Sequence, residues 1–206
     1  MEKSKRKEME LQLRRGEIVS QAERIFSAKG FYNTTMAEIA DASGFAIGTL
    51  YQYFEGKENL YTVMVSEKLD RMYKEIRDAV NRVDCIRDKI ETLVRAHFRF
   101  VENNVDFCNL FIRGEGASLT KGEMILRDKM IADYLNHVGY VEYIMRWGIE
   151  TNSLKKMEPR MMAYVLLGII RSFIFNWMLD NKNNNLSNKV DCVLDVFLRG
   201  VGAEVQ

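Results

Sequence analysis

Residues that could perform acid–base, nucleophilic or metal chemistry are few and scattered in this sequence. It has two histidines, His97 and His137, and three cysteines, Cys85, Cys108 and Cys192. An odd number of widely spaced cysteines suggests neither a disulfide framework nor a set of metal ligands. The sequence also contains no glycine-rich phosphate loop and no recognisable pair of nucleophile and base. We therefore expect no enzyme activity, no bound metal and no other cofactor.

Side chains suited to holding a small molecule are plentiful between His97 and Trp177. A pocket lined by the aromatic residues of this region would suit a hydrophobic or aromatic ligand. A buried His97, Arg113 or Arg171 could in addition bind a carboxylate or phosphate. Aromatic residues at helical spacing are more often core residues, so a packed core is the alternative interpretation. The residues that we predict to line a ligand site are His97, Phe107, Phe111, Arg113, Tyr143, Trp147 and Arg171.

The elements that must position these residues are predicted to be helices. A chain of 206 residues, 47% of them hydrophobic, can bury a sizeable core. Its single proline, Pro159, and its many leucines, methionines, glutamates and lysines favour long uninterrupted helices over strands. Apolar periodicity, caps and glycine stops then give the positions. The predicted helices span residues 8–29, 35–42, 46–54, 57–82, 85–103, 106–113, 121–150, 159–180 and 187–203.

Two of the short helices carry the signals of a helix-turn-helix at about residues 35–54. Thr35 and Glu38 match a capping box, in which each side chain accepts a hydrogen bond from the backbone of the other residue. Gly44 can take the positive φ of a tight turn, and Ala40 is small where the two helices would cross. Such a unit places its second helix in the DNA major groove. An ordinary helical hairpin would use the same apolar positions and is the alternative.

The residues of this motif closely resemble the TetR family of transcription regulators. The matching segments are 34–40 (TTMAEIA), 44–54 (GFAIGTLYQYF) and 57–60 (KENL). The resemblance implies a three-helix DNA-binding head, residues 1–56, on a larger helical body, residues 57–206. The body would bind a ligand and form a homodimer through its last two helices.

Carried over position by position, the resemblance also implies roles in DNA binding. The residues placed at backbone phosphates are Thr35, Tyr51, Tyr53 and Lys57. The residues placed at base edges are Ile47, Gly48, Thr49 and Gln52. Gln52 could pair with adenine, and Ile47 or Thr49 could contact a thymine methyl group. This chain departs from the family pattern at Ala46 and Ile47, where relatives commonly carry a serine and a basic residue, so one cap and one polar contact are missing.

Positive charge is concentrated before the motif and not within it. Residues 1–58 hold nine basic and nine acidic residues, and none of the basic ones lies between Phe31 and Phe54. Residues 1–15 hold six basic residues against three acidic ones. This basic arm could follow the phosphate backbone or enter the minor groove, or it could be a solvated tail.

The last two predicted helices carry enough apolar residues to form a subunit interface. Residues 161–179 are long and apolar enough to be considered as a membrane span, but Arg171 in their middle argues against it. Two copies of these helices packed across a two-fold axis would cover the apolar surface and suit a palindromic operator. A monomeric core is the alternative. The residues that we predict at the dimer interface are Leu167, Ile170, Ile174, Trp177, Val193, Leu194, Phe197 and Val201.

These observations predict a cytoplasmic repressor that binds operator DNA as a homodimer and is released by a hydrophobic or aromatic small molecule. The charged N-terminus lacks the apolar stretch of a signal peptide. The alternative is a DNA-binding regulator that has no small-molecule effector and is controlled by a protein partner.

Overall fold

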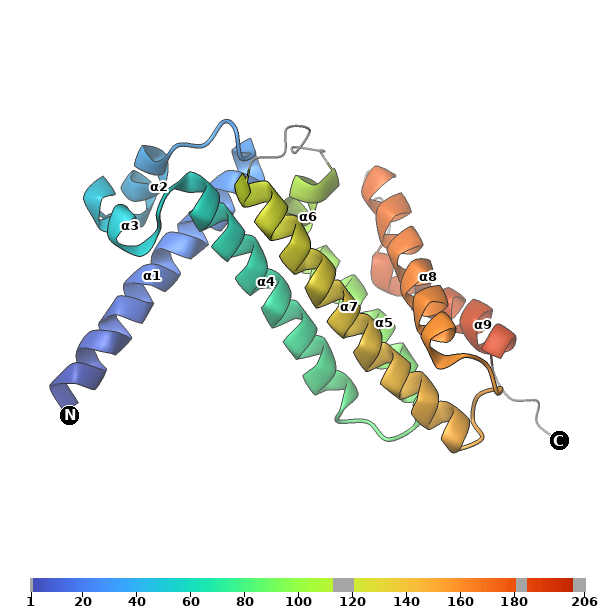
Figure 1. The fold of residues 1–206 in the computed structure, drawn as a ribbon. Coiled ribbons are helices and arrows are strands. Elements are labelled where there is room, and N and C mark those ends of the chain that lie inside the picture. Colours follow the sequence, from blue (N-terminus) through green and yellow to red (C-terminus); the bar gives the residue numbers. More distant parts are fainter. Residues whose placement is uncertain (1, 113–120, 181–184, 202–206) are drawn as a thin grey trace. The chain divides into compact units, whose positions relative to one another are not determined.

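The computed structural model describes residues 2–112, 121–180 and 185–201, and all regular structure in these residues is helical (Figure 1). This confirms the predicted all-α fold. The elements are α1 (Glu2–Lys29), α2 (Met36–Ser43), α3 (Ile47–Tyr53), α4 (Lys57–Val80), α5 (Ile86–Asn103), α6 (Val105–Ile112), α7 (Lys121–Glu150), α8 (Pro159–Leu179), the 3-10 helix η1 (Leu186–Lys189) and α9 (Val190–Val201).

The observed helices differ from the predicted ones mainly at the two ends of the chain. Helix α1 begins at Glu2, although the apolar pattern that predicts it starts only near residue 8. Lysine, arginine, glutamate and methionine are good helix formers even where nothing is buried, and they extend the helix toward the N-terminus. The predicted basic arm is therefore helical. At the other end, a 3-10 turn occupies residues 186–189, and α9 starts at Val190.

The chain divides into two compact units. The N-terminal unit comprises Met1–Leu69 and Asp106–Met130, and the C-terminal unit comprises Asp70–Val105 and Ile131–Gln206. Long helices α4 and α7 contribute to both units. Each unit is described below by itself.

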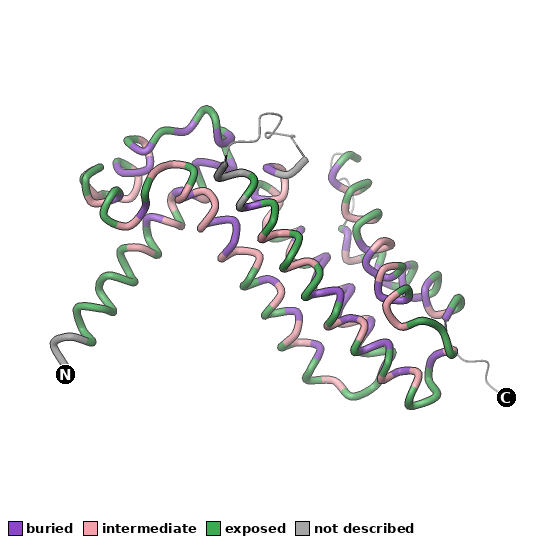
Figure 2. Tube along the Cα trace, in the orientation of Figure 1, coloured by how far each residue is buried: buried purple, intermediate pink, exposed green. Residues whose placement is uncertain are grey.

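The N-terminal unit holds its short helices against the second half of α1. Ile18, Ala22 and Phe26 on one face of α1 are fully buried, and so is Ile39 of α2. The N-terminal part of α1, in contrast, is exposed along the part whose burial is described (Figure 2). An aromatic cluster and ion pairs then join α1 to α4. The Tyr61 ring lies edge-on to that of Phe26, with 5.1 Å between the centroids.

Two ion pairs also join α4 to α1. The Arg15 guanidinium lies 2.6 Å from the Glu67 carboxylate, and the Lys68 ammonium lies 2.7 Å from that of Glu23. Lys68 is also positioned over the ring of Phe107 in α6. Contacts among α1, α4 and α6 thus add to the packing of the N-terminal unit.

The C-terminal unit is organised around α5, which packs against α8, η1 and α9. Ile90 and Phe98 of α5 and Leu166 of α8 are fully buried. The Glu102 carboxylate accepts hydrogen bonds from the backbone N–H of Ser187, at 2.9 Å, and from its hydroxyl, and so anchors η1. These contacts fix where the last helix begins.

Candidate nucleic-acid interface

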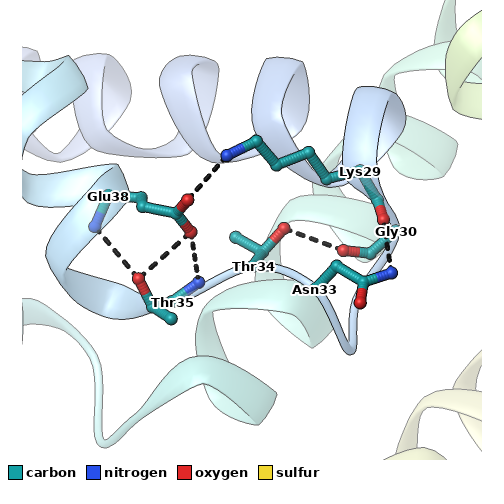
Figure 3. A network of polar contacts seen from close by, with 6 residues as sticks. All are labelled: Lys29, Gly30, Asn33, Thr34, Thr35 and Glu38. Atoms are coloured by element: carbon teal, nitrogen blue, oxygen red, sulfur yellow. Dashed lines mark hydrogen bonds and ion pairs between the residues drawn. The ribbon is translucent and has the colours of Figure 1, made fainter.

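The capping box at the start of α2 forms as predicted, and it belongs to a wider polar network (Figure 3). The Thr35 hydroxyl oxygen accepts a hydrogen bond from the Glu38 N–H at 3.2 Å, and the Glu38 carboxylate accepts one from the Thr35 N–H at 2.9 Å. The Lys29 ammonium contacts the same carboxylate at 2.6 Å. This bond, followed by those from Thr35, lowers the pKa of Glu38 to about 2. The network fixes the angle at which α2 leaves the loop.

The turn between α2 and α3 uses glycine for a conformational reason. Gly44 has φ of 72°, in the left-handed region that other residues resist. Its N–H donates back to the Asp41 carbonyl at 3.2 Å, and the Phe45 N–H donates to Ala40 at 3.1 Å. Ala46 then begins α3 without a side-chain cap, as its alanine side chain requires. Two short helices joined by a short turn that contains glycine form the helix-turn-helix unit.

Helix α3 buries one side and presents the other to solvent. Leu50 is fully buried and anchors the helix, and Phe54 is buried at its end. Ile47 and Tyr51 are 45% and 54% exposed. Gly48 and Gln52 are exposed, whereas Thr49 and Tyr53 are half-buried. Four of the residues predicted to contact DNA therefore share one exposed helix face.

Gly48 lies inside α3, where glycine weakens a helix by about 1 kcal/mol relative to alanine. Nothing in the surrounding structure explains this choice, because a Cβ built at this position meets no atom within 4 Å. Its φ also lies outside the left-handed region. The absence of a side chain leaves the backbone open to close approach from outside, as glycine does where a ligand comes near a helix.

Lys57 is less available than the sequence predicts. Its ammonium donates a hydrogen bond to the Phe31 carbonyl at 3.0 Å and lies 4.5 Å from the centre of the Phe31 ring. A lysine ammonium has three N–H donors, so this bond leaves donors that could reach a phosphate. Thr35 is similarly committed to its cap. For both residues a phosphate contact stays a prediction.

One basic residue of the N-terminal segment, Arg15 of α1, is held against the end of the motif. Besides its ion pair with Glu67, Arg15 lies over the ring of Phe54, with 5.6 Å between the guanidinium carbon and the ring centre. Arg14 pairs with Glu10 along the exposed surface of α1. Since residues 31–54 contain no lysine or arginine, the groups that can attract phosphate there are helix N-termini and hydroxyls.

The residues predicted to line a ligand site do not gather in one place within the described part of the chain. His97 is buried in α5, whereas Arg171 is exposed on α8. Tyr143 and Trp147 line a hollow of about 190 Å³ together with Lys89. Phe107 is buried in the N-terminal unit, whereas His97, Tyr143, Trp147 and Arg171 belong to the C-terminal unit. Arg113 and the side chain of Phe111 lie outside the described residues.

His97 does not have the anion-binding character that the sequence suggests for it. Burial lowers its pKa, so the ring is neutral. Its Nδ1 contacts the Leu93 carbonyl at 2.7 Å, and its Nε2 contacts Nε2 of His137 at 3.1 Å. The exposure of Arg171 likewise removes the burial that would strengthen its hold on a carboxylate. The structure therefore does not support binding of a carboxylate or phosphate by a charged His97 or a buried Arg171.

The structure shows which of the predicted interface side chains the chain itself covers, and the interface stays a prediction. The predicted side chains of α8 and α9 that are buried by this chain's own packing are Leu167, Ile170, Val193, Leu194, Phe197 and Val201. Ile174 and Trp177 are half-buried. Helix α8 carries apolar residues on two sides. One side is buried by the chain itself, and the other side is exposed. The large apolar side chains exposed on α8 and α9 are Met161, Val165, Phe175, Leu179 and Val196, which we call the α8–α9 apolar surface.

Helix α8 is also the one helix of the described residues that is long and apolar enough to cross a membrane. Its most apolar window has a mean hydropathy of 1.6, and 33% of that window is buried inside the chain. Buried helices of soluble proteins have the same composition. Sequence periodicity identifies these apolar positions, but only the packing of α8 shows which of them remain uncovered.

The fold and the exposed α3 face define a DNA-binding transcription regulator, and comparisons with known proteins agree. Residues 18–64 match the family described as bacterial regulatory proteins of the tetR family, and residues 65–200 match the C-terminal region of YsiA-like proteins. The chain belongs to the tetR family of bacterial regulatory proteins. Its relatives are regulators and not enzymes.

Several similar proteins are named for fatty acid metabolism. The fatty acid metabolism regulator protein of Bacillus subtilis (strain 168) is 20% identical over 186 residues, which cover 90% of this chain and 94% of that protein. The solved structure of the fatty acid degradation regulator FadR from Bacillus halodurans has a TM-score of 0.75 and 22% identity, covering 91% of this chain and 95% of that chain. FadR from Bacillus subtilis, solved in complex with stearoyl-CoA, has a TM-score of 0.74 and 19% identity, covering 89% and 97%.

Proposed function

We propose that this regulator is a cytoplasmic repressor that binds a palindromic operator as a homodimer and leaves it when a long-chain acyl ligand binds the C-terminal unit. The observation that carries the DNA-binding part is the exposed face of α3. It combines a phenol, an amide, an apolar side chain and a bare backbone, at Tyr51, Gln52, Ile47 and Gly48. The floor of the DNA major groove offers base edges that form hydrogen bonds and thymine methyl groups, and both match this set of side chains.

The homodimer is supported by the α8–α9 apolar surface. Val165 and Phe175 are 53% and 52% exposed, on a helix of which only a minor part is buried by its own chain. A second copy of the same surface would cover these side chains through a two-fold axis. A membrane is a poorer cover, because Arg171 in the middle of the helix would cost about 2.5–3.5 kcal/mol to insert. A two-fold dimer would also present two α3 helices to successive turns of DNA.

The acyl character of the effector is supported by the names of the similar proteins, one of which was solved with stearoyl-CoA. The sequence analysis expects a hydrophobic or aromatic ligand, and a long acyl chain is hydrophobic. Acyl-CoA would shift the protein toward a conformation that no longer fits the operator, provided that it binds the released form more tightly.

Substitutions on α3 test the DNA contacts. An operator is first selected from a random-sequence DNA library with the full chain. Tyr51→Ala should weaken binding to all operator variants by about tenfold, since a hydrogen bond to a charged phosphate is lost. Gln52→Ala should instead relax base preference at one position, where a bidentate contact discriminates by about 1–3 kcal/mol. Lys57→Ala should resemble Tyr51→Ala. Gel-shift titration on operator variants measures each effect.

Tyr143→Ala provides a matched control, because Tyr143 is also an exposed tyrosine, 64% against 54% for Tyr51, and belongs to the C-terminal unit. It should leave operator affinity unchanged. A Tyr51→Ala variant that binds as well as the native chain would contradict the proposed interface. Fluorescence anisotropy of a labelled operator then tests the effector: stearoyl-CoA should release the DNA, and free CoA should not. If neither does, the acyl ligand is wrong and the DNA interface stands.

A further inference from the structure

The two histidines of the chain, 40 residues apart in sequence, meet inside the C-terminal unit. His97 on α5 is 9% exposed and His137 on α7 is 1% exposed, and their Nε2 atoms are 3.1 Å apart. The Tyr73 ring from α4 stacks on His137 at 4.6 Å between centroids. A polar pair thus lies where two apolar side chains could fill the space without any cost of desolvation.

The contacts of the pair determine which nitrogens carry protons. The Leu93 carbonyl can only accept a hydrogen bond, so Nδ1 of His97, 2.7 Å away, must donate. In a neutral His97 the Nε2 atom is then an acceptor. The Nε2 of His137 must carry the hydrogen that lies between the two rings. It follows that Nδ1 of His137 has a lone pair and no hydrogen.

Both rings are neutral near pH 7. Burial, followed by electrostatic interactions with His97 and Arg77, lowers the pKa of His137 to about 3. Burial also lowers the pKa of His97. The assignment of one hydrogen to each ring therefore holds under ordinary conditions.

The lone pair on Nδ1 of His137 is buried, and no described residue donates a hydrogen bond to it. A buried acceptor without a donor is unfavourable. The Tyr73 ring covers a face of the imidazole, whereas the lone pair lies in the ring plane, so a donor must approach from the ring edge. Tyr73 and Tyr140 beside the pair are half-buried, and the cluster therefore extends from the interior toward the surface.

We propose that Nδ1 of His137 is a ligand-recognition point that accepts a hydrogen bond from an O–H or N–H group on a neutral, largely apolar part of the ligand. This inference rests on the proposed function as a ligand-responsive regulator and specifies the chemistry that the C-terminal unit recognises. His97 acts as a positioning residue, because its bond to Leu93 fixes the tautomer of His137 through the shared hydrogen. A ligand group that only accepts hydrogen bonds would face the lone pair and be rejected.

The tautomers can be observed directly in the native full chain. With only two histidines in the sequence, ¹⁵N-histidine labelling gives four ring nitrogens that long-range ¹H–¹⁵N spectra can assign. At pH 7 we expect hydrogen on Nδ1 of His97 and on Nε2 of His137. Hydrogen on Nδ1 of His137 would overturn the proposal. So would an Nδ1 that is already hydrogen-bonded without ligand and does not respond to it, because a buried water would then be its partner.

Two probes that differ by a single donor test the recognition step. The probes are 1-decanol, which has an O–H, and decyl methyl ether, which has the same chain and only an acceptor. We expect the native protein to bind the alcohol about fivefold more tightly, the ratio that one hydrogen bond supplies. The Nδ1 resonance of His137 should move with the alcohol and not with the ether. Calorimetry gives the affinities.

Two variants complete the test. His137→Phe keeps an aromatic ring against Tyr73 and should remove the preference for the alcohol, whereas Tyr164→Phe, which removes a phenol bonded to Arg160 on α8, should retain it. If His137→Phe does not fold, the spectra of the native chain decide alone. Equal binding of both probes with an unmoved resonance would overturn the recognition point and leave ligand control intact. Binding of neither probe would overturn the apolar ligand and the recognition point together.

Discussion

The two units distribute polar and apolar side chains in opposite ways. In the N-terminal unit, Leu50 is buried and Tyr51 beside it is exposed, as in any amphipathic surface helix. In the C-terminal unit, His137 is buried whereas Val165 and Phe175 are exposed. In the first arrangement a single chain buries its own apolar residues and exposes polar ones that could contact DNA. The second is incomplete, because its exposed side chains require an apolar cover and its buried histidine has an unused acceptor.

The largest effect should come from placing a charge on the α8–α9 apolar surface. Val165→Glu should convert the proposed dimer into a monomer, because a carboxylate would lose its hydration in an apolar interface. Operator affinity should fall by about a hundredfold or more, since two linked contacts become two separate ones. Analytical ultracentrifugation and gel-shift titration measure the two quantities.

Ile131→Glu is the control, because Ile131 is a similarly exposed apolar residue of the same unit, on α7. It should leave both assembly and operator binding unchanged. A Val165→Glu chain that stays dimeric would show that α8 is not the subunit interface, and the contrast between the units would then lose its explanation.

Acid should destabilise the two units in different pH windows. His137 has a pKa of about 3 in the folded chain against an ordinary 6.5, so the unfolded state binds more protons between these values. Stability should be complete above pH 6.5 and should decrease below it, by up to about 1.4 kcal/mol per pH unit for one group. Glu38 of the N-terminal unit has a pKa of about 2 against 4.5, so its contribution is lost only as pH falls from 4.5 toward 2.

Intrinsic fluorescence isolates the first window, because Trp147 and Trp177, the only tryptophans, both belong to the C-terminal unit. Urea unfolding followed at pH 7, 6, 5 and 4 should show the loss beginning below pH 6.5. His137→Phe should reduce this dependence, and the buried His97 accounts for the part that remains. An unchanged urea midpoint between pH 7 and 5 in the native chain would mean that His137 is not held neutral.

The sequence predicts the N-terminal unit better than the C-terminal one for a physical reason. A capping box spans four residues and a glycine turn spans two, so Thr35, Glu38 and Gly44 could be placed without knowledge of the rest of the chain. The His97–His137 pair joins two helices whose packing no local pattern records. Periodicity found the apolar residues of α8, but a helix that is apolar on two sides does not reveal which side its own chain covers.

Removal of the cap tests how locally the N-terminal unit is determined. Thr35→Ala should cost about 1 kcal/mol of unfolding free energy, because the Glu38 N–H loses its acceptor at the start of α2. Thermal unfolding followed by circular dichroism measures the loss. Thr151→Ala, which removes an exposed hydroxyl at the end of α7, should cost less. Equal losses would indicate that tertiary packing and not the cap fixes α2.

The smallest effect has opposite signs for stability and for DNA binding. Gly48→Ala should stabilise the chain by up to about 1 kcal/mol, since alanine favours the helix and its Cβ meets no atom within 4 Å. The same methyl group should weaken operator binding, because it would stand between the α3 backbone and the groove. Gly139→Ala on α7 has equally open surroundings and should stabilise without changing affinity. If Gly48→Ala binds the operator as tightly as Gly139→Ala does, the bare backbone of α3 has no part in recognition, and Tyr51 and Gln52 must account for the contact.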